Sequence, residues 1–256
     1  NFAAGVNAGN SIASGGNYNT VVGDEAGTAL TTGDANVAVG FEALKTEDGH
    51  GNNVAVGYRA LKTLNVGATA YNTAVGNDAG TSMTKGVNNT LIGGLAGDAL
   101  TGNDAYSGGS NNVAVGRSSL GADTLGSASV AVGFETLLAQ DFTTATDTYN
   151  IAVGYRAGKS VTTGIQNNII GGLAGEALTD ADYNVAIGTF ALNTDTKGNK
   201  SVAIGRSALA QQNFTSSTDS HNTAVGYLAG SQVTTGIRNT IMGSEAGDAL
   251  TDADYN

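Results

Sequence analysis

The sequence predicts an all-β protein, a parallel β-solenoid of about 14 coils, and three observations lead to this prediction. A short motif, NVAVG at 53–57 in one copy, recurs along the whole chain. The glycines that close successive copies are 17 residues apart, or 17 plus a few inserted residues. Glycine accounts for 39 of 256 residues, and proline, cysteine and tryptophan are absent. A fixed period with whole-residue insertions is typical of a solenoid, in which each repeat forms one coil stacked on the last.

The glycine that closes each copy, here called the marker glycine, gives the register of the array. The marker glycines are Gly5, Gly23, Gly40, Gly57, Gly76, Gly93, Gly116, Gly133, Gly154, Gly171, Gly188, Gly205, Gly226 and Gly243. The coils group into four-coil blocks that begin near residues 1, 72, 150 and 222, and in each block Ala-Gly follows the first two markers whereas Ala-Leu usually follows the next two. We therefore expect residues 1–256 to form a single continuous array, a segment of a longer fibre.

One copy of the motif shows what each position is expected to do. Alternation places Val54 and Val56 on one face of a strand and Ala55 on the other. Both faces are apolar, so both must be covered. We expect Val54 and Val56 to face the core of their own coil and Ala55 to face a neighbouring chain. Gly57 is expected at a bend with positive φ.

An asparagine precedes the strand in most copies, and a coil of this length suits two short strands and two turns. These asparagines are Asn19, Asn36, Asn53, Asn72, Asn89, Asn112, Asn150, Asn184, Asn222 and Asn239. Their side chains can stack as an amide ladder from coil to coil. Alternatively, each can cap its own turn.

The second apolar strand face suggests self-association. A slender coil cannot cover both faces of every strand, and three copies around an axis would bury the alanine rows together. The sequence thus predicts a homotrimer that associates through Ala-row strand faces, with the bulkier Val21, Leu91, Ile169 and Ile241 as wider layers of that interface. A two-fold stack would cover the same face.

Composition excludes several partners and chemistries. The formal net charge of −11 opposes binding to nucleic acid or to an anionic membrane, since both require clustered basic residues. No apolar run approaches the roughly 18 residues of a membrane span, so membrane insertion is not expected. Without cysteine there is neither a disulfide nor thiol catalysis. The chain begins at Asn1 without a basic and apolar leader, so we expect any signal sequence to be absent or already removed.

Several units resemble a known family. NVAVGFEAL (36–44), NVAVGYRAL (53–61), KSVAIGRSAL (200–209) and NTAVGYLAG (222–230) resemble the YadA-like head repeats of trimeric autotransporter adhesins, and similar arrays occur in phage tail-fibre proteins. The resemblance covers essentially the whole chain. It implies a left-handed parallel β-roll trimerised into a fibre, with no catalytic site, in an extracellular location on a virion fibre or a bacterial cell surface. The long period and the Asn and Thr that often replace the opening Ser favour the phage-fibre branch.

Insertions between coils are the candidate contact sites. They follow the fourth coil of a block, at 62–71, 139–149 and 210–221, with a further bulge near 106–110. Loops on a rigid scaffold commonly carry binding. Tyr106, Phe142 and Phe214 are therefore candidate surface contacts for a host receptor or glycan. The alternative is that these aromatic side chains fold back on the core.

Other polar groups have simpler interpretations. Asp180 with Asp182 could hold a cation between coils, but the calcium-binding sequence patterns are missing, so solvated turn acids are the better interpretation. His50 and His221 are interpreted as turn residues, because adjacent residues such as Ser220 and His221 cannot converge as a triad requires. We predict no catalytic residue, no cofactor and no metal.

These points predict a structural and adhesive fibre segment, not an enzyme: a stiff trimeric shaft or head of a phage tail fibre, whose lateral loops contact a host surface. The alternative is the head of a bacterial trimeric autotransporter-type adhesin. An ice-binding solenoid and a glycan-cleaving tailspike are weaker alternatives, because threonine is irregular at the first strand position (Thr20, Val37, Val54) and the acidic residues lie mainly in turns.

Overall fold

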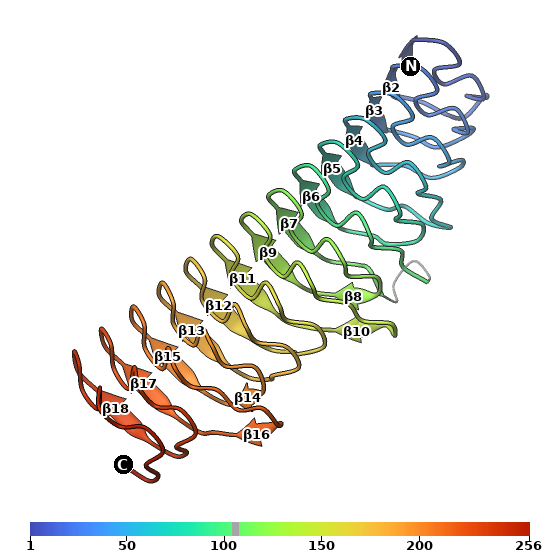
Figure 1. The fold of residues 1–256 in the computed structure, drawn as a ribbon. Coiled ribbons are helices and arrows are strands. Elements are labelled where there is room, and N and C mark those ends of the chain that lie inside the picture. The colour runs from blue at the N-terminus through green and yellow to red at the C-terminus, as the bar shows by residue number, and fades with distance from the viewer. Residues whose placement is uncertain (104–107) are drawn as a thin grey trace. The chain divides into compact units, whose positions relative to one another are not determined.

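The computed structural model describes residues 1–103 and 108–256, and this part of the chain contains strands and turns but no helix, hence none that could span a membrane. It confirms a parallel β-solenoid of about 14 coils with a 17-residue period (Figure 1). Each coil has one three-residue strand at the motif. The expected second strand is absent from most of the described coils, because turns with left-handed residues occupy that part of the repeat.

Contacts divide the chain into two compact units, the first comprising Asn1–Ser129 with Asp141–Asp147 and the second Val130–Gln140 with Thr148–Asn256. The main strands of the first unit are β1 (Phe2–Ala4), β2 (Thr20–Val22), β3 (Val37–Val39), β4 (Val54–Val56), β5 (Thr73–Val75), β6 (Thr90–Ile92) and β7 (Val113–Val115). Those of the second are β9 (Val130–Val132), β11 (Ile151–Val153), β12 (Asn168–Ile170), β13 (Val185–Ile187), β15 (Val202–Ile204), β17 (Thr223–Val225) and β18 (Thr240–Met242).

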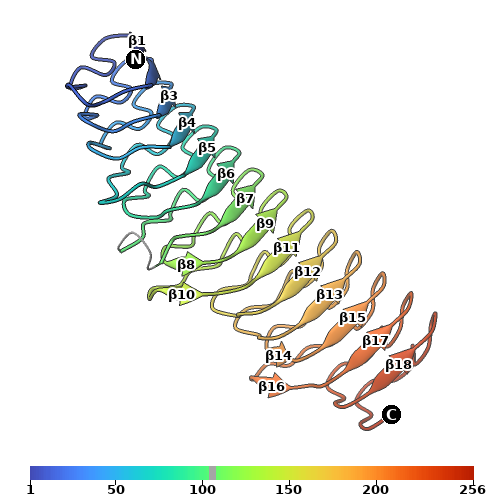
Figure 2. The same ribbon diagram turned by 180° about the vertical axis from the view of Figure 1, so that it is seen from behind.

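Two further pairs of very short strands mark the insertions. They are β8 (Gly126–Ser127) with β10 (Thr146–Asp147) in the first unit, and β14 (Gly198–Asn199) with β16 (Thr218–Asp219) in the second. Both views place these pairs on the side of the coil away from the main strands (Figures 1 and 2). The insertions thus lengthen the turn side of the coil and leave the strand side regular.

Neighbouring main strands pair in parallel and in register with the repeat. Val54, Ala55 and Val56 of β4 lie opposite Val37, Ala38 and Val39 of β3. The central row of the sheet is therefore apolar throughout each unit, and the two outer rows carry mainly β-branched side chains. A slip of one residue would exchange the two faces of a strand, so this uniform pattern specifies the register.

Left-handed backbone conformations make the coil tight. In the coil of β4, φ is positive at Asn52, Gly57, Arg59 and Leu61, at 63°, 139°, 53° and 49°. Non-glycine residues adopt this region at a cost of about 1 kcal/mol or more each. The amides of Asn52, Arg59 and Leu61 donate to carbonyls of adjacent coils at 2.9–3.0 Å, which offsets that cost. Gly57 needs glycine, because a Cβ there would lie 2.2 Å from the carbonyl oxygen of Gly76.

The strand faces are the reverse of the sequence prediction. Ala55 is fully buried, and Val54 and Val56 are partly exposed. Ala55 therefore faces the core of its own coil, and the two valines face outward. The prediction that the alanine row meets a neighbouring chain was wrong, because the turn half of the same coil covers that face. The two halves of a coil approach so closely that only a small side chain fits between them at most positions.

Whether Ala-Gly or Ala-Leu follows the marker glycine depends on which side chains fill the core of that coil and its neighbours. In the third and fourth coils of a block the strand centre is alanine, and a buried leucine such as Leu61 fills the coil. Where the strand centre is Leu91, Gly97 of the same coil and Gly80 of the preceding coil leave room for it, and a Cβ on either glycine would lie 2.8 Å from Leu91. Val21, Ile169 and Ile241 are buried in the same way against glycines, so these four residues are core residues and not the interface layers that the sequence suggested.

The asparagine row forms the amide ladder: the side chains bond mainly to the turn of the next coil and do not simply cap their own turns. Asn184 Oδ1 accepts the backbone amide of Ser201 in the next coil at 2.9 Å, and its Nδ2 donates to the carbonyl of Gly198 at 2.9 Å. The amide of Asn184 itself donates to Oδ1 of Asn167 at 3.0 Å. A buried asparagine such as Asn184 thus satisfies the turn of the next coil, and its own amide is bonded by the asparagine of the previous coil.

Candidate interaction surface and polar cluster

The first and third residues of the main strands point outward and form a largely apolar surface, here called the strand face, in which threonine, and Asn168 in β12, hold several of the first positions. These positions are mostly valine, isoleucine or threonine, and the larger ones are substantially exposed, for example Ile92 and Ile170 at 39% and 40%. The strand face extends over every coil within each compact unit. Contiguous exposed apolar surface of this kind is typical of an interaction site.

Aromatic residues flank the strands at both ends. One row directly follows the marker glycine and the other directly precedes the ladder asparagine; their members are Phe41, Tyr58, Phe134, Tyr155 and Tyr227, and Tyr18, Tyr71, Tyr149, Tyr183 and Tyr255. Tyr58 stacks on Phe41 with ring centroids 5.5 Å apart, and the guanidinium of Arg59 lies 5.0 Å from the ring centroid of Tyr58. Tyrosine and arginine around an apolar centre match the composition of protein interfaces.

The aromatic residues predicted as loop contacts do not serve that purpose. Phe142 and Phe214 are 6% and 7% exposed, and Phe214 packs where a Cβ on Gly198 would be only 2.8 Å away. The prediction that they contact a receptor or glycan from the surface was wrong, because the insertions fold back and bury their aromatic side chains. Tyr106 lies outside the described residues.

A buried acid holds each insertion in place. Asp195 Oδ1 accepts the amides of Gly198 in its own turn, at 3.1 Å, and of Phe214 in the next coil, at 3.0 Å. Asp123 makes the equivalent two bonds, to the amides of Gly126 and Phe142 at 3.0 and 3.2 Å. Both acids lie seven residues after a marker glycine in the third coil of a block, so the position is a structural clamp.

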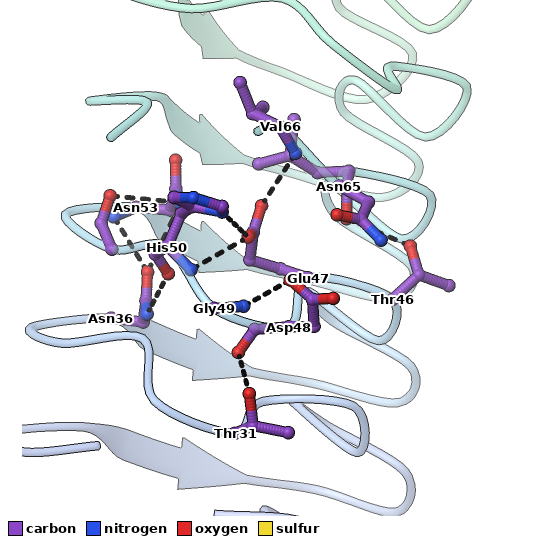
Figure 3. A network of polar contacts seen from close by, with 12 residues as sticks. Thr31, Asn36, Thr46, Glu47, Asp48, Gly49, His50, Asn53, Asn65 and Val66 are labelled. Atoms are coloured by element: carbon purple, nitrogen blue, oxygen red, sulfur yellow. Dashed lines mark hydrogen bonds and ion pairs between the residues drawn. The ribbon is translucent and has the colours of Figure 1, made fainter. Parts of the chain in front are cut away.

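Glu47 occupies the same position in the first block and has different neighbours. Its carboxylate accepts the amides of His50 and Val66 at 3.2 and 3.3 Å (Figure 3). It is fully buried, and burial raises the pKa of this carboxyl, an effect that the two amide hydrogen bonds and the nearby His50 oppose. Oxygens of Glu47 and Asp48 and a ring nitrogen of His50 lie within 4.8 Å of one another. The sequence correctly predicted that His50 lies in a turn, but it did not predict that the His50 ring lies beside Glu47 and Asp48.

The other predicted polar sites lie in turns. Asp182 accepts the amide of Ile165 at 2.8 Å, and burial raises the pKa of its carboxyl. Asp180 lies 3.5 Å from the Nζ of Lys197. The two carboxylates are thus engaged with neighbouring coils. His221 is exposed, with φ of 50°, at the position before a ladder asparagine.

Asn167, Ser129 and Ser201 also occupy ladder positions, although they were not identified from the sequence. Asn167 belongs to the row, but a second asparagine follows it and obscured the register. Where Ser201 replaces asparagine, the buried Gln212 supplies the missing amide: its Nε2 donates to Ser201 Oγ at 2.8 Å and to Asp195, and its Oε1 accepts from Asn222 at 2.8 Å. When the coils are aligned by marker glycine, the sequence does show this substitution: in the coil where Ser201 replaces the asparagine, Gln212 lies seven residues after the marker glycine.

The described residues enclose no pocket. Comparisons with protein-family models, with curated proteins and with solved structures find no match. Among the described residues, the strand face, its aromatic flanks and the Glu47 cluster are therefore the candidate interaction sites.

Proposed function

We propose that this chain is a structural segment of a trimeric extracellular fibre of the phage tail-fibre kind, in which the strand faces of three copies pack together. The observation that carries the proposal is the strand face itself, a largely apolar outward surface that continues from coil to coil within each unit. The function is mechanical: many identical rungs, each joined to the next by backbone bonds and the amide ladder, resist unfolding as a unit.

The surface that associates differs from the one expected from the sequence. The alanine row is buried within each coil, so the outward valines and isoleucines are the side chains that a second copy could cover. Because each strand contributes two such residues, an interface along this face grows with the number of coils. The formal net charge of −11 requires that apolar contact outweigh repulsion between copies, which an interface repeated over many coils supplies.

The decisive experiment is the native mass of the chain, measured by analytical ultracentrifugation. We expect three times the chain mass of 25.3 kDa. A double substitution on the strand face, Val185→Lys with Ile187→Lys, places two charges at the interface and is expected to yield folded monomers, as judged by an unchanged circular dichroism spectrum. A monomeric wild-type chain would contradict the proposal.

A matched control separates interface disruption from altered charge. Thr215→Lys with Ser216→Lys adds the same two charges at exposed turn positions and is expected to leave the trimer intact. Equal dissociation of both variants would show that net charge, and not the strand face, governs assembly. A dimeric wild type would replace the three-fold arrangement by a two-fold stack.

Host-surface contact is the adhesive part of the proposal, and it now rests on exposed residues of the turn side, since Phe142 and Phe214 are buried. Binding of the fluorescently labelled chain to host cells tests it. We expect binding to survive Phe214→Leu, which alters only a core residue. If the chain binds no candidate host, the adhesive part of the proposal is wrong and the chain is a structural spacer only.

A further inference from the structure

We propose that Glu47, Asp48 and His50 form a binding site for a divalent transition metal, with Zn²⁺ as the best-fitting ion. The proposal does not depend on the fibre function, because the three residues belong to one turn of one chain. It rests on the state of the His50 ring, on the spacing of the ligand atoms and on the contrast with the equivalent turns.

The Nδ1 atom of His50 is the first indication of a ligand. It is fully shielded from solvent and has no hydrogen-bond partner, although the ring as a whole is about one-third exposed. Its nearest charged group is Oε1 of Glu47, at 3.5 Å. A charge-assisted hydrogen bond between such groups would be about 2.7–2.9 Å long. The two atoms are therefore too far apart for a strong direct hydrogen bond, yet close enough to bind one ion between them.

The spacing suits two ligands of one metal ion. Zinc binds histidine nitrogen at about 2.0–2.1 Å and carboxylate oxygen at about 2.0–2.2 Å with tetrahedral angles, which places two such ligand atoms about 3.4 Å apart. The observed separation of Nδ1 and Oε1 is 3.5 Å. Asp48 offers a third oxygen within 4.8 Å of the other two ligand atoms, and its exposed side chain would have to move closer to reach the tetrahedral spacing. Water can complete the tetrahedron from the exposed side of Asp48.

The turn is held in shape without the metal. The carbonyl of Asp48 accepts the backbone amide and the hydroxyl of Thr31 at 2.6 and 3.1 Å, and the carbonyl of His50 accepts Nδ2 of Asn36 at 3.1 Å (Figure 3). The previous coil thus fixes the backbone at two of the three ligand residues. Such preorganisation lowers the cost of bringing the ligand atoms together.

Charge also favours a cation here. Among the described residues no lysine or arginine pairs with Glu47 or Asp48, and Glu47 is fully buried. A divalent ion would neutralise the two carboxylates and leave the imidazole neutral. The nitrogen ligand and the small number of oxygens favour zinc over calcium or magnesium.

The equivalent turns lack the additional ligands. Asp123 and Asp195 hold the insertion as Glu47 does, but Thr124 and Thr196 stand in place of Asp48, and glycines replace His50. Clamping an insertion therefore requires only the buried acid. The Asp48 and His50 side chains are additions in one coil, and a metal bound there would tie the turn to the insertion through the bond from Glu47 to Val66.

Zinc titration of the chelator-treated chain, in competition with a chromophoric zinc indicator, tests the site. We expect one Zn²⁺ per chain with a Kd of about 10 μM or tighter. His50→Gln and Asp48→Asn, which leave the Glu47 clamp intact, should each weaken binding by about tenfold or more. His221→Gln removes the other histidine of the chain and should leave the affinity unchanged.

A second readout reports the ligand geometry. Co²⁺ added to the wild-type chain should give the intense visible absorption of a tetrahedral site, and the His50→Gln variant should not. A wild-type Kd of about 1 mM or weaker overturns the proposal. So does an affinity that His50→Gln leaves unchanged, or one that His221→Gln reduces equally, because the ion would then be bound elsewhere.

Discussion

The packing around Leu91 can be tested by converting its coil, which has a large strand centre and a glycine at 97, into the kind that has an alanine centre and a leucine at the equivalent position. Leu91→Ala alone leaves a void between Gly80 and Gly97, and Gly97→Leu alone forces a side chain into space that Leu91 fills, since even a Cβ there would be 2.8 Å from its Cδ2. Together the two substitutions recreate the alanine-and-leucine pairing found around Leu61. The backbone permits this, because Gly97 has φ of 54° and Leu61 has 49°.

The magnitudes follow from burial and backbone strain. Leu91 is fully buried, so Leu91→Ala should reduce the free energy of unfolding by about 2–5 kcal/mol. Gly97→Leu alone should cost about 1–3 kcal/mol from overpacking and about 1–2 kcal/mol from the left-handed backbone. In the double variant the introduced leucine occupies the void, so we expect a coupling energy of about 2 kcal/mol in favour of the pair.

Urea unfolding followed by circular dichroism measures this double-mutant cycle. All four proteins must be compared at one chain concentration, because self-association would shift the midpoint. Equal slopes are required before the free energies are compared. A coupling energy within about 0.5 kcal/mol of zero would refute the reasoning, since it would mean that Leu91 and Gly97 do not compete for the same space.

Three other predictions concern the ladder, a marker glycine and the buried acid. Asn184→Ala removes two buried hydrogen bonds to the next coil and should lower the free energy of unfolding by about 2–6 kcal/mol. The control Asn213→Ala changes an exposed asparagine and should lower it by less than about 0.5 kcal/mol. Similar urea midpoints for the two variants would contradict the ladder. Gly57→Ala should cost about 3 kcal/mol or more, and Gly67→Ala, whose Cβ would meet no atom within 4 Å, should be almost neutral in the same assay. Burial raises the pKa of Glu47 in the folded chain, so the folded state holds this proton more tightly than the unfolded state. Wild-type stability should therefore fall relative to Glu47→Gln as pH rises from about 4.3 through the raised pKa, and parallel pH profiles in thermal melts would exclude this effect.

The period, the parallel stacking and the asparagine row could be predicted because they depend only on repetition. The assignment of faces could not be read so directly. In Val54-Ala55-Val56 both faces are apolar, so alternation separates them without saying which lies inside. The deciding quantity is the thickness of the coil, which follows from the left-handed turns at residues such as Arg59 and Leu61. Nothing in those side chains indicates a positive φ.

The fate of the insertions was also hidden from the sequence. Phe142 and Phe214 lie in threonine- and serine-rich segments that suggest exposure. In the structure their backbone amides donate to the buried carboxylates of Asp123 and Asp195, and both side chains are buried. That bond joins residues 19 positions apart and becomes visible only when the coils are aligned. His50 was assigned to a turn from the sequence, but the isolation of its Nδ1 depends on the neighbouring side chains.

The coil-to-coil bonds bear on how the chain acquires its structure. Most of them join residues 16 to 18 positions apart, and a separation of about 17 residues in a chain of 256 corresponds to a relative contact order of about 0.07, a value usual for helical bundles and well below that of most β proteins. Closing such short loops is fast and costs little entropy. During synthesis a coil can complete its bonds as soon as the next coil leaves the ribosome, so unpaired strand edges are exposed only briefly, at the growing end.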